Sequence, residues 1–248
     1  MKRITDIEES RRQFLLSLLG AGAFMSLPVH SAQFSRLPNR LPPGQSIYRY
    51  VGDIRVNGVA ATLNSTIAAG DVITTGPRSF IIFVVEQDAF ILRSNSEMTV
   101  RPAPEASPTV ARPGTVKAAI LPTAYALKRG KALSVLASRR TRISTPTAII
   151  GIRGTGVYVE ANPDEAYVCV CYGATDLASA QDPTITEEVI AEHHDAPKYI
   201  IGGTNPRIAP APFKNHADEE LLLIETLVGR TTPYMVPQGI PRTRNSYF

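Results

Sequence analysis

The chain has little of what several large protein classes require. Its 248 residues include no tryptophan and only two cysteines, so it is not a disulfide-rich secreted scaffold. It has no Gly-rich phosphate-binding loop and no His-Glu-x-x-His motif, so the sequence supports neither nucleotide binding by such a loop nor zinc-dependent proteolysis. No apolar run reaches the ~20 residues that a membrane-spanning helix needs. We therefore expect no membrane span in the mature chain.

The charge of the chain is small overall but unevenly distributed. The formal net charge is +4. Residues 112–153 include nine Lys or Arg and no acidic residue, whereas residues 160–195 include nine Asp or Glu and no Lys or Arg. Because only one aromatic residue, Tyr125, lies among the basic ones, we expect no nucleic-acid binding. The pattern favours two oppositely charged surfaces that neutralise one another.

The first 32 residues have the features of an export signal. Arg11 and Arg12 precede an interrupted apolar stretch, Phe14–Leu27, and small residues follow it. Ser10–Leu16 reads Ser-Arg-Arg-Gln-Phe-Leu-Leu and resembles the twin-arginine signal, except that the pattern ends in Lys. The resemblance implies export of the folded protein to the periplasm, with cleavage near residue 31 or 32. The alternative is an ordinary secretory signal with two chance arginines.

Short β-type runs separated by turn residues dominate the rest of the chain. Asn57-Gly58 is a strong two-residue hairpin signal. The expected strands are Ser46–Tyr50, Asp53–Val56, Asp71–Thr75, Phe80–Glu86, Phe90–Arg93, Met98–Arg101, Tyr125–Leu127, Ala132–Leu136, Arg142–Ser144, Ala148–Ile152, Gly156–Glu160, Ala166–Tyr172, Glu188–Ala191 and Lys198–Ile201.

Five motifs within these runs resemble the FecR domain, a periplasmic sensor module. They are Gly-Asp-Ile-Arg-Val-Asn-Gly (52–58), Gly-Asp-Val-Ile-Thr-Thr-Gly (70–76), Phe-Ile-Ile-Phe (80–83), Asn-Ser-Glu-Met-Thr-Val (95–100) and Thr-Pro-Thr-Ala-Ile-Ile-Gly-Ile-Arg-Gly-Thr (145–155). The resemblance covers residues 46–160. It implies an all-β fold, a compact β-sandwich or short β-solenoid, that binds a small ligand or an envelope protein and is not an enzyme. The classic regulators also carry a cytoplasmic anti-sigma segment and a membrane span. Neither is found here, so we do not expect signalling through a sigma factor.

The closing motif of this domain is expected to be structural. Its glycines allow close approach of the backbone, and its arginine could form a buried ion pair or bind an anion, of which we favour the ion pair. The motif residues are Thr145, Pro146, Gly151, Arg153, Gly154 and Thr155.

A β-rich extension, residues 161–229, follows the FecR-like region, and residues 230–248 form a tail. Leu221, Ile224 and Val228 recur with helical spacing, which predicts one amphipathic helix over 216–228. Asn215 is the expected N-cap, and Gly229 is expected to end the helix.

The extension also contains every cysteine and histidine of the mature chain. Its cysteines, Cys169 and Cys171, lie two apart on an expected strand, so their side chains share one face. The three mature histidines are His193, His194 and His216. Thiolate and imidazole are the ligands that zinc and copper prefer. We therefore expect both cysteines and at least one histidine to converge on one site, in carboxylate-rich surroundings that favour a cation.

Other interpretations of these residues remain open. The cysteines could be small core residues and the histidines surface residues, or the cysteines could form a strained disulfide. A third interpretation is nucleophilic catalysis by Cys171 with His194 and Asp195. The sequence names no cofactor beyond possible zinc or copper.

Overall fold

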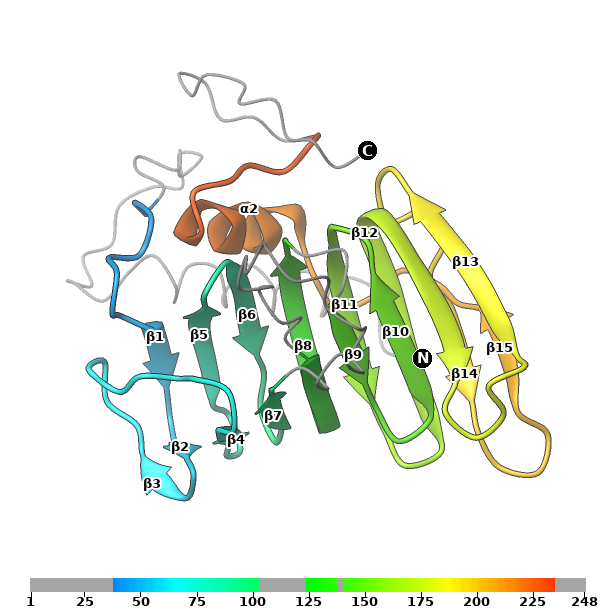
Figure 1. The fold of residues 1–248 in the computed structure, drawn as a ribbon, viewed down its shortest axis with the longest axis horizontal. Coiled ribbons are helices and arrows are strands. Elements are labelled where there is room, and N and C mark those ends of the chain that lie inside the picture. The colour runs from blue at the N-terminus through cyan, green and yellow to red at the C-terminus, as the bar shows by residue number, and fades with distance from the viewer. Residues whose placement is uncertain (1–37, 103–123, 138–140, 235–248) are drawn as a thin grey trace, which may run out of the picture. The chain divides into compact units, whose positions relative to one another are not determined.

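The computed structural model describes residues 38–102, 124–137 and 141–234, so the predicted export signal lies outside the described residues (Figure 1). Over the described residues the fold is all-β with one helix, as the sequence predicts. The elements are β1 (Ile47–Val51), β2 (Ile54–Val56), β3 (Val59–Ala60), β4 (Val72–Thr75), β5 (Phe80–Val85), β6 (Asp88–Leu92), β7 (Glu97–Arg101), β8 (Ala124–Leu136), β9 (Arg142–Ser144), β10 (Ala148–Ile152), β11 (Thr155–Ala161), β12 (Glu165–Ser179), β13 (Thr186–Ala191), β14 (Lys198–Ile201), β15 (Arg207–Pro210) and α2 (Asp218–Leu227).

The strands form two sheets that share the long strands β8 and β12. Sheet A has the order β1-β5-β6-β8-β11-β12-β14-β15, and sheet B has the order β3-β2-β4-β7-β8-β9-β10-β12-β13. All pairs are antiparallel except β8–β9, which is parallel. Because both shared strands belong to both sheets, β8, β11, β12, β10 and β9 pair into a closed ring.

Each shared strand passes from one sheet to the other at a glycine. β8 changes partners at Gly130, with φ of 92°, and β12 changes partners at Gly173, with φ of 88°. A Cβ atom at Gly173 would lie 2.4 Å from the carbonyl oxygen of Gly154. Only glycine fits both the left-handed backbone and the close approach. The sequence predicts two separate strands in place of β8, Tyr125–Leu127 and Ala132–Leu136, because polar residues lie between them.

The main core combines the apolar side chains of both sheets. Val157 and Val168 from sheet A belong to the same buried cluster as Ile73 and Met98 from sheet B. Side chains alternate along a strand, so the residues next to Val157 on β11 and next to Val168 on β12 point to the opposite face of sheet A. We call this the outer face. It carries Tyr158, Glu160, Tyr167, Cys169 and Cys171, all of them buried.

Residues 211–234, including α2, cover part of the outer face. α2 contacts β6 and β8 and buries Leu221, Ile224 and Leu227 (Figure 1). Its acidic first turn suits the positive end of the helix dipole. The N-cap is Ala217 rather than the expected Asn215, whose φ of 66° takes it out of the helical path. Gly229 follows the C-cap with φ of 77°, as predicted.

The closing motif joins the two sheets. The Thr145 hydroxyl accepts a hydrogen bond from the Ala148 amide at 2.8 Å and shapes the turn before β10. Arg153 donates to Asp176 at 2.9 Å and to Glu188 at 2.6 Å. A residue of the basic stretch therefore pairs with two residues of the acidic stretch. The ion pair expected for Arg153 is present, although at the surface rather than buried.

Residues 46–160 and the extension, residues 161–229, share sheet A. Their predicted boundary falls at the end of β11, which pairs along its length with β12 of the extension. No helix among the described residues is long and apolar enough to cross a membrane.

Candidate metal centre

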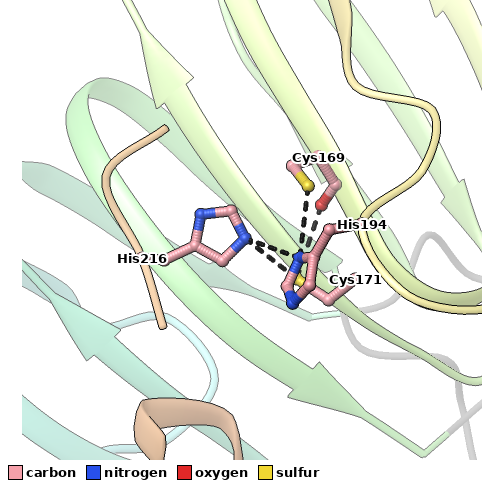
Figure 2. A group of neighbouring side chains, drawn as sticks. All are labelled: Cys169, Cys171, His194 and His216. Atoms are coloured by element: carbon pink, nitrogen blue, oxygen red, sulfur yellow. Dashed lines mark hydrogen bonds between the residues drawn. The ribbon is translucent and has the colours of Figure 1, made fainter. Parts of the chain in front are cut away.

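Four side chains converge on one point at the outer face of sheet A: those of Cys169, Cys171, His194 and His216 (Figure 2). Both cysteines lie on β12, His194 lies in the turn between β13 and β14, and His216 lies two residues before α2. One ligand atom from each residue lies within 4.8 Å of all the others. The convergence that the spacing predicts is therefore present for four of the five residues.

The distances between the ligand atoms are those of a small coordination shell. Cys169 Sγ lies 3.5 Å from His194 Nδ1, and Cys171 Sγ lies 3.4 Å from His216 Nε2. The two nitrogens are 3.0 Å apart. In a tetrahedral centre with metal–sulfur bonds of ~2.3 Å and metal–nitrogen bonds of ~2.0 Å, sulfur and nitrogen lie ~3.5 Å apart and two nitrogens ~3.3 Å apart.

Strand geometry brings the two sulfurs together. Alternation along β12 turns Val168 and Val170 into the main core and both cysteines to the outer face. Both thiols are fully buried and neither is in a disulfide. The strand thus presents two sulfur ligands from a rigid backbone.

Backbone and carboxylate contacts orient His194. Its amide donates to the Cys171 carbonyl at 3.1 Å, and its φ of 55° turns the imidazole toward the sulfurs. The Nε2–H group donates to Asp218 Oδ1 at 2.8 Å. With the proton on Nε2, the lone pair of Nδ1 points at Cys169 and His216.

A carbonyl group orients His216 in the same way. Its Nδ1–H group donates to the Lys214 carbonyl at 2.8 Å, so the lone pair of Nε2 points into the cluster. The ring stacks on Tyr158 at 4.5 Å and packs against Phe213 at 4.7 Å between centroids. His216 is only 1% exposed.

The two imidazoles therefore present lone pairs to one another across 3.0 Å. Two acceptors at this distance repel unless a positive species lies between or beside them. A proton could serve, as could a metal ion that also binds the sulfurs.

The two thiols differ in acidity. The hydrogen bond from the Cys171 thiol is the largest effect on Cys169; it outweighs burial and lowers the pKa of Cys169 to about 4. Burial, followed by the interaction with Cys169, raises the pKa of Cys171. Of the two thiols, Cys169 therefore loses its proton more readily. A thiolate beside imidazole lone pairs is the electronic state that a cation binds.

His193 lies outside the cluster. Its side chain is 52% exposed, and its Nε2 lies 2.9 Å from Asp218 Oδ2, the oxygen that His194 does not use. Adjacent residues point in different directions, so only one of the two histidines reaches the sulfurs.

The carboxylate that orients His194 belongs to Asp218, the first residue of α2. Its pKa is lowered because the hydrogen bonds from His194 and His193 outweigh the effect of burial. Asp195, the partner suggested for a catalytic Cys171 and His194, is exposed instead. The sequence carried one signal for Asp218: it follows His216 by two residues at a helix start.

Comparisons with known proteins give limited results. No sequence-family model matches the chain, and no curated protein matches it. Among solved structures, two crystal structures of a proposed anti-sigma factor from Parabacteroides distasonis ATCC 8503 match in part, each with 13% identity and a TM-score of 0.40. The alignments cover 56% of this chain and 58% of that protein, so the chain spans little more than half of its length.

Proposed function

We propose that this protein is an exported, FecR-like β module of the periplasm that binds one zinc or copper ion through Cys169, Cys171, His194 and His216. The observation that carries the proposal is the meeting of four ligand atoms within 4.8 Å. Two thiolates and two neutral imidazoles are a ligand set of zinc and of soft copper sites.

The hydrogen-bond partners of the two imidazoles support the same proposal. Histidines that bind metals commonly donate their other ring N–H to a carboxylate or a backbone carbonyl. His194 donates to the Asp218 carboxylate and His216 donates to the Lys214 carbonyl. Both rings are thus fixed in the tautomer that a metal ion requires.

The number and burial of the ligands favour a non-enzymatic role. Structural zinc sites have four protein ligands, whereas catalytic sites keep one position for water or substrate. Here four side chains converge on one point, which leaves no protein ligand position vacant in a four-coordinate site, and three of them are at most 1% exposed. We expect the ion to stabilise a binding or sensing module rather than to catalyse a reaction.

Export completes the proposal and rests on the sequence. Arg11 and Arg12 resemble the twin-arginine signal, which implies export of the folded protein. Folding in the cytoplasm would allow the ion to bind before the thiols meet an oxidising compartment. The envelope ligand or protein partner of the FecR-like region is not specified by its residues.

Metal content of the purified protein tests the site. We expect about one equivalent of zinc or copper by elemental analysis of the wild-type protein, and less than about a tenth in the Cys169→Ser/Cys171→Ser variant. His194→Gln and His193→Gln form a matched pair of neighbours, of which only His194→Gln should lose the ion. Far-ultraviolet circular dichroism verifies that each variant is folded. A metal-free wild type, or equal loss in the two histidine variants, would contradict the proposal.

Fractionation tests export. Replacing Arg11 and Arg12 by Lys should leave precursor in the cytoplasm. Mature protein reaching the periplasm in a strain without the twin-arginine pathway would show that the signal is of the ordinary secretory type.

A further inference from the structure

We propose that the bound ion fastens a C-terminal cap, residues 211–234, onto the outer face of sheet A, so that metal occupancy controls the docking of this cap. The inference rests on the proposed function and assigns a regulatory role to the same site.

The ligands divide between the sheet and the cap. Cys169 and Cys171 belong to β12 of sheet A, whereas His216 belongs to the cap. His194 comes from the β13–β14 turn and adds a second link through Asp218, the first residue of α2. An ion in this centre therefore joins three segments that lie more than twenty residues apart in sequence.

The region around His216 depends heavily on polar contacts. The Tyr167 hydroxyl donates to the Pro212 carbonyl at 3.0 Å, and Lys214 pairs with Glu160 at 3.2 Å. Arg93 donates to the Asn215 carbonyl at 3.0 Å and to Glu220 at 2.9 Å. This end of the cap surrounds the metal centre and includes no residue of the main core cluster.

The other end of the cap has attachments of its own. Arg230 donates to the Gln87 carbonyl at 2.7 Å, and Glu225 accepts a hydrogen bond from the Tyr172 hydroxyl. The Leu41 amide donates to the Leu227 carbonyl at 2.9 Å. Since none of these contacts involves a metal ligand, this end of α2 should stay docked when the ion leaves.

Removing the ion leaves an unfavourable arrangement at the first end. Two lone pairs would face one another at 3.0 Å beside two fully buried sulfurs, and only a proton could then take the place of the ion between them. A buried polar group without a partner costs free energy that local opening can recover. His216 is the ligand that can move most easily, because it lies on a connection rather than on a strand. The start of α2 would move with it.

Hydrogen–deuterium exchange of the full mature chain tests the inference, with zinc as the probe. We compare zinc-loaded protein with protein stripped by a chelator. The reporters are the amides of His194, Glu220 and Leu221, which donate to Cys171, Ala217 and Ala217. Their protection should fall about tenfold or more without zinc. Amides of β5 and β6, and those of Val228 and Gly229 at the end of α2, should change far less.

Arg93→Gln provides a matched control. It removes contacts at the same end of the cap but leaves all four ligands, so zinc should remain bound and still protect the reporters. His216→Gln should reproduce the stripped state.

The other possible results contradict either the cap inference or the proposed metal site. If zinc binds stoichiometrically and the reporters do not respond, the cap inference fails while the proposed metal site stands. Exchange rising equally in β5 and β6 would also overturn it, because the ion would then hold the whole fold. The cap inference fails as well if Arg93→Gln loses as much protection with zinc bound as the stripped wild type. A protein that binds no metal fails the proposed function itself.

Discussion

His194 and His216 face one another with Nδ1 and Nε2 3.0 Å apart, and each ring donates its other N–H away from the gap. Neither imidazole can turn its N–H inward without losing a hydrogen bond to Asp218 or to the Lys214 carbonyl. The lone-pair arrangement that we propose for cation binding therefore depends on groups that are not themselves ligands.

Asp218→Ala should weaken metal binding without abolishing it. Loss of a group that orients a metal-binding histidine typically lowers metal affinity about 10–100-fold, because His194 is then free to turn its lone pair away. Competition against a fluorescent zinc chelator measures the change. Glu219→Ala is the control, since it removes a neighbouring negative charge that has no contact with either histidine. Equal effects of the two substitutions would assign the role to charge alone.

Gly173→Ala should destabilise the fold strongly, by about 3 kcal/mol, since it adds a left-handed backbone penalty to a steric clash. The added Cβ atom would lie 2.4 Å from the Gly154 carbonyl oxygen. Gly203→Ala is the matched control, because Gly203 has φ of 82° but open space around it. That variant should lose only about 1 kcal/mol. Urea unfolding compares them, and similar losses would mean that the bend in β12 tolerates a side chain.

Asp88→Asn should reduce the loss of stability between pH 4 and pH 7. Burial raises the pKa of Asp88, despite hydrogen bonds from the Ala137 amide and Tyr125. A raised carboxyl pKa means that the folded protein holds the proton more tightly than the unfolded chain. The charged carboxylate therefore costs stability as pH rises above ~3.9, until it is fully ionised in the fold.

Urea unfolding at several pH values measures this effect. The variant should gain stability relative to wild type as pH rises, since an amide cannot ionise. Asp164→Asn, at an exposed position, is the control for the change in charge. A wild-type curve that runs parallel to that of Asp88→Asn would contradict the prediction.

Arg153→Ala should change stability little, because exposed ion pairs contribute little. Arg153, Asp176 and Glu188 all have side chains about half exposed. A double-mutant cycle with Asp176→Asn isolates the pair. A coupling free energy as large as that of a buried pair would show that the closing motif depends on this contact.

Local sequence patterns predicted much of this structure. Alternation around Cys169 and Cys171 predicted that both sulfurs share a face, because a strand repeats every two residues. Turn residues such as Asn57-Gly58 predicted where most of the strands begin and end. α2 was predicted to within two residues.

What could not be predicted depends on long-range contacts. The choice of His194 over His193 follows from a left-handed backbone at His194 and its pairing with β12. The role of Asp218 depends on where α2 docks, which no local pattern encodes. β15 was missed because its four residues end in proline and extend only after pairing with β14.

The closed ring of strands has a consequence for the order in which an ion is exchanged. β12 belongs to this ring and pairs with β11 along the segment that carries the sulfurs, so the two thiolates move together and little. The two histidines lie on connections that can swing away one at a time. If the site holds an ion, a chelator should therefore displace the imidazoles first, and Cys169 and Cys171 would be the residues that hold the ion longest.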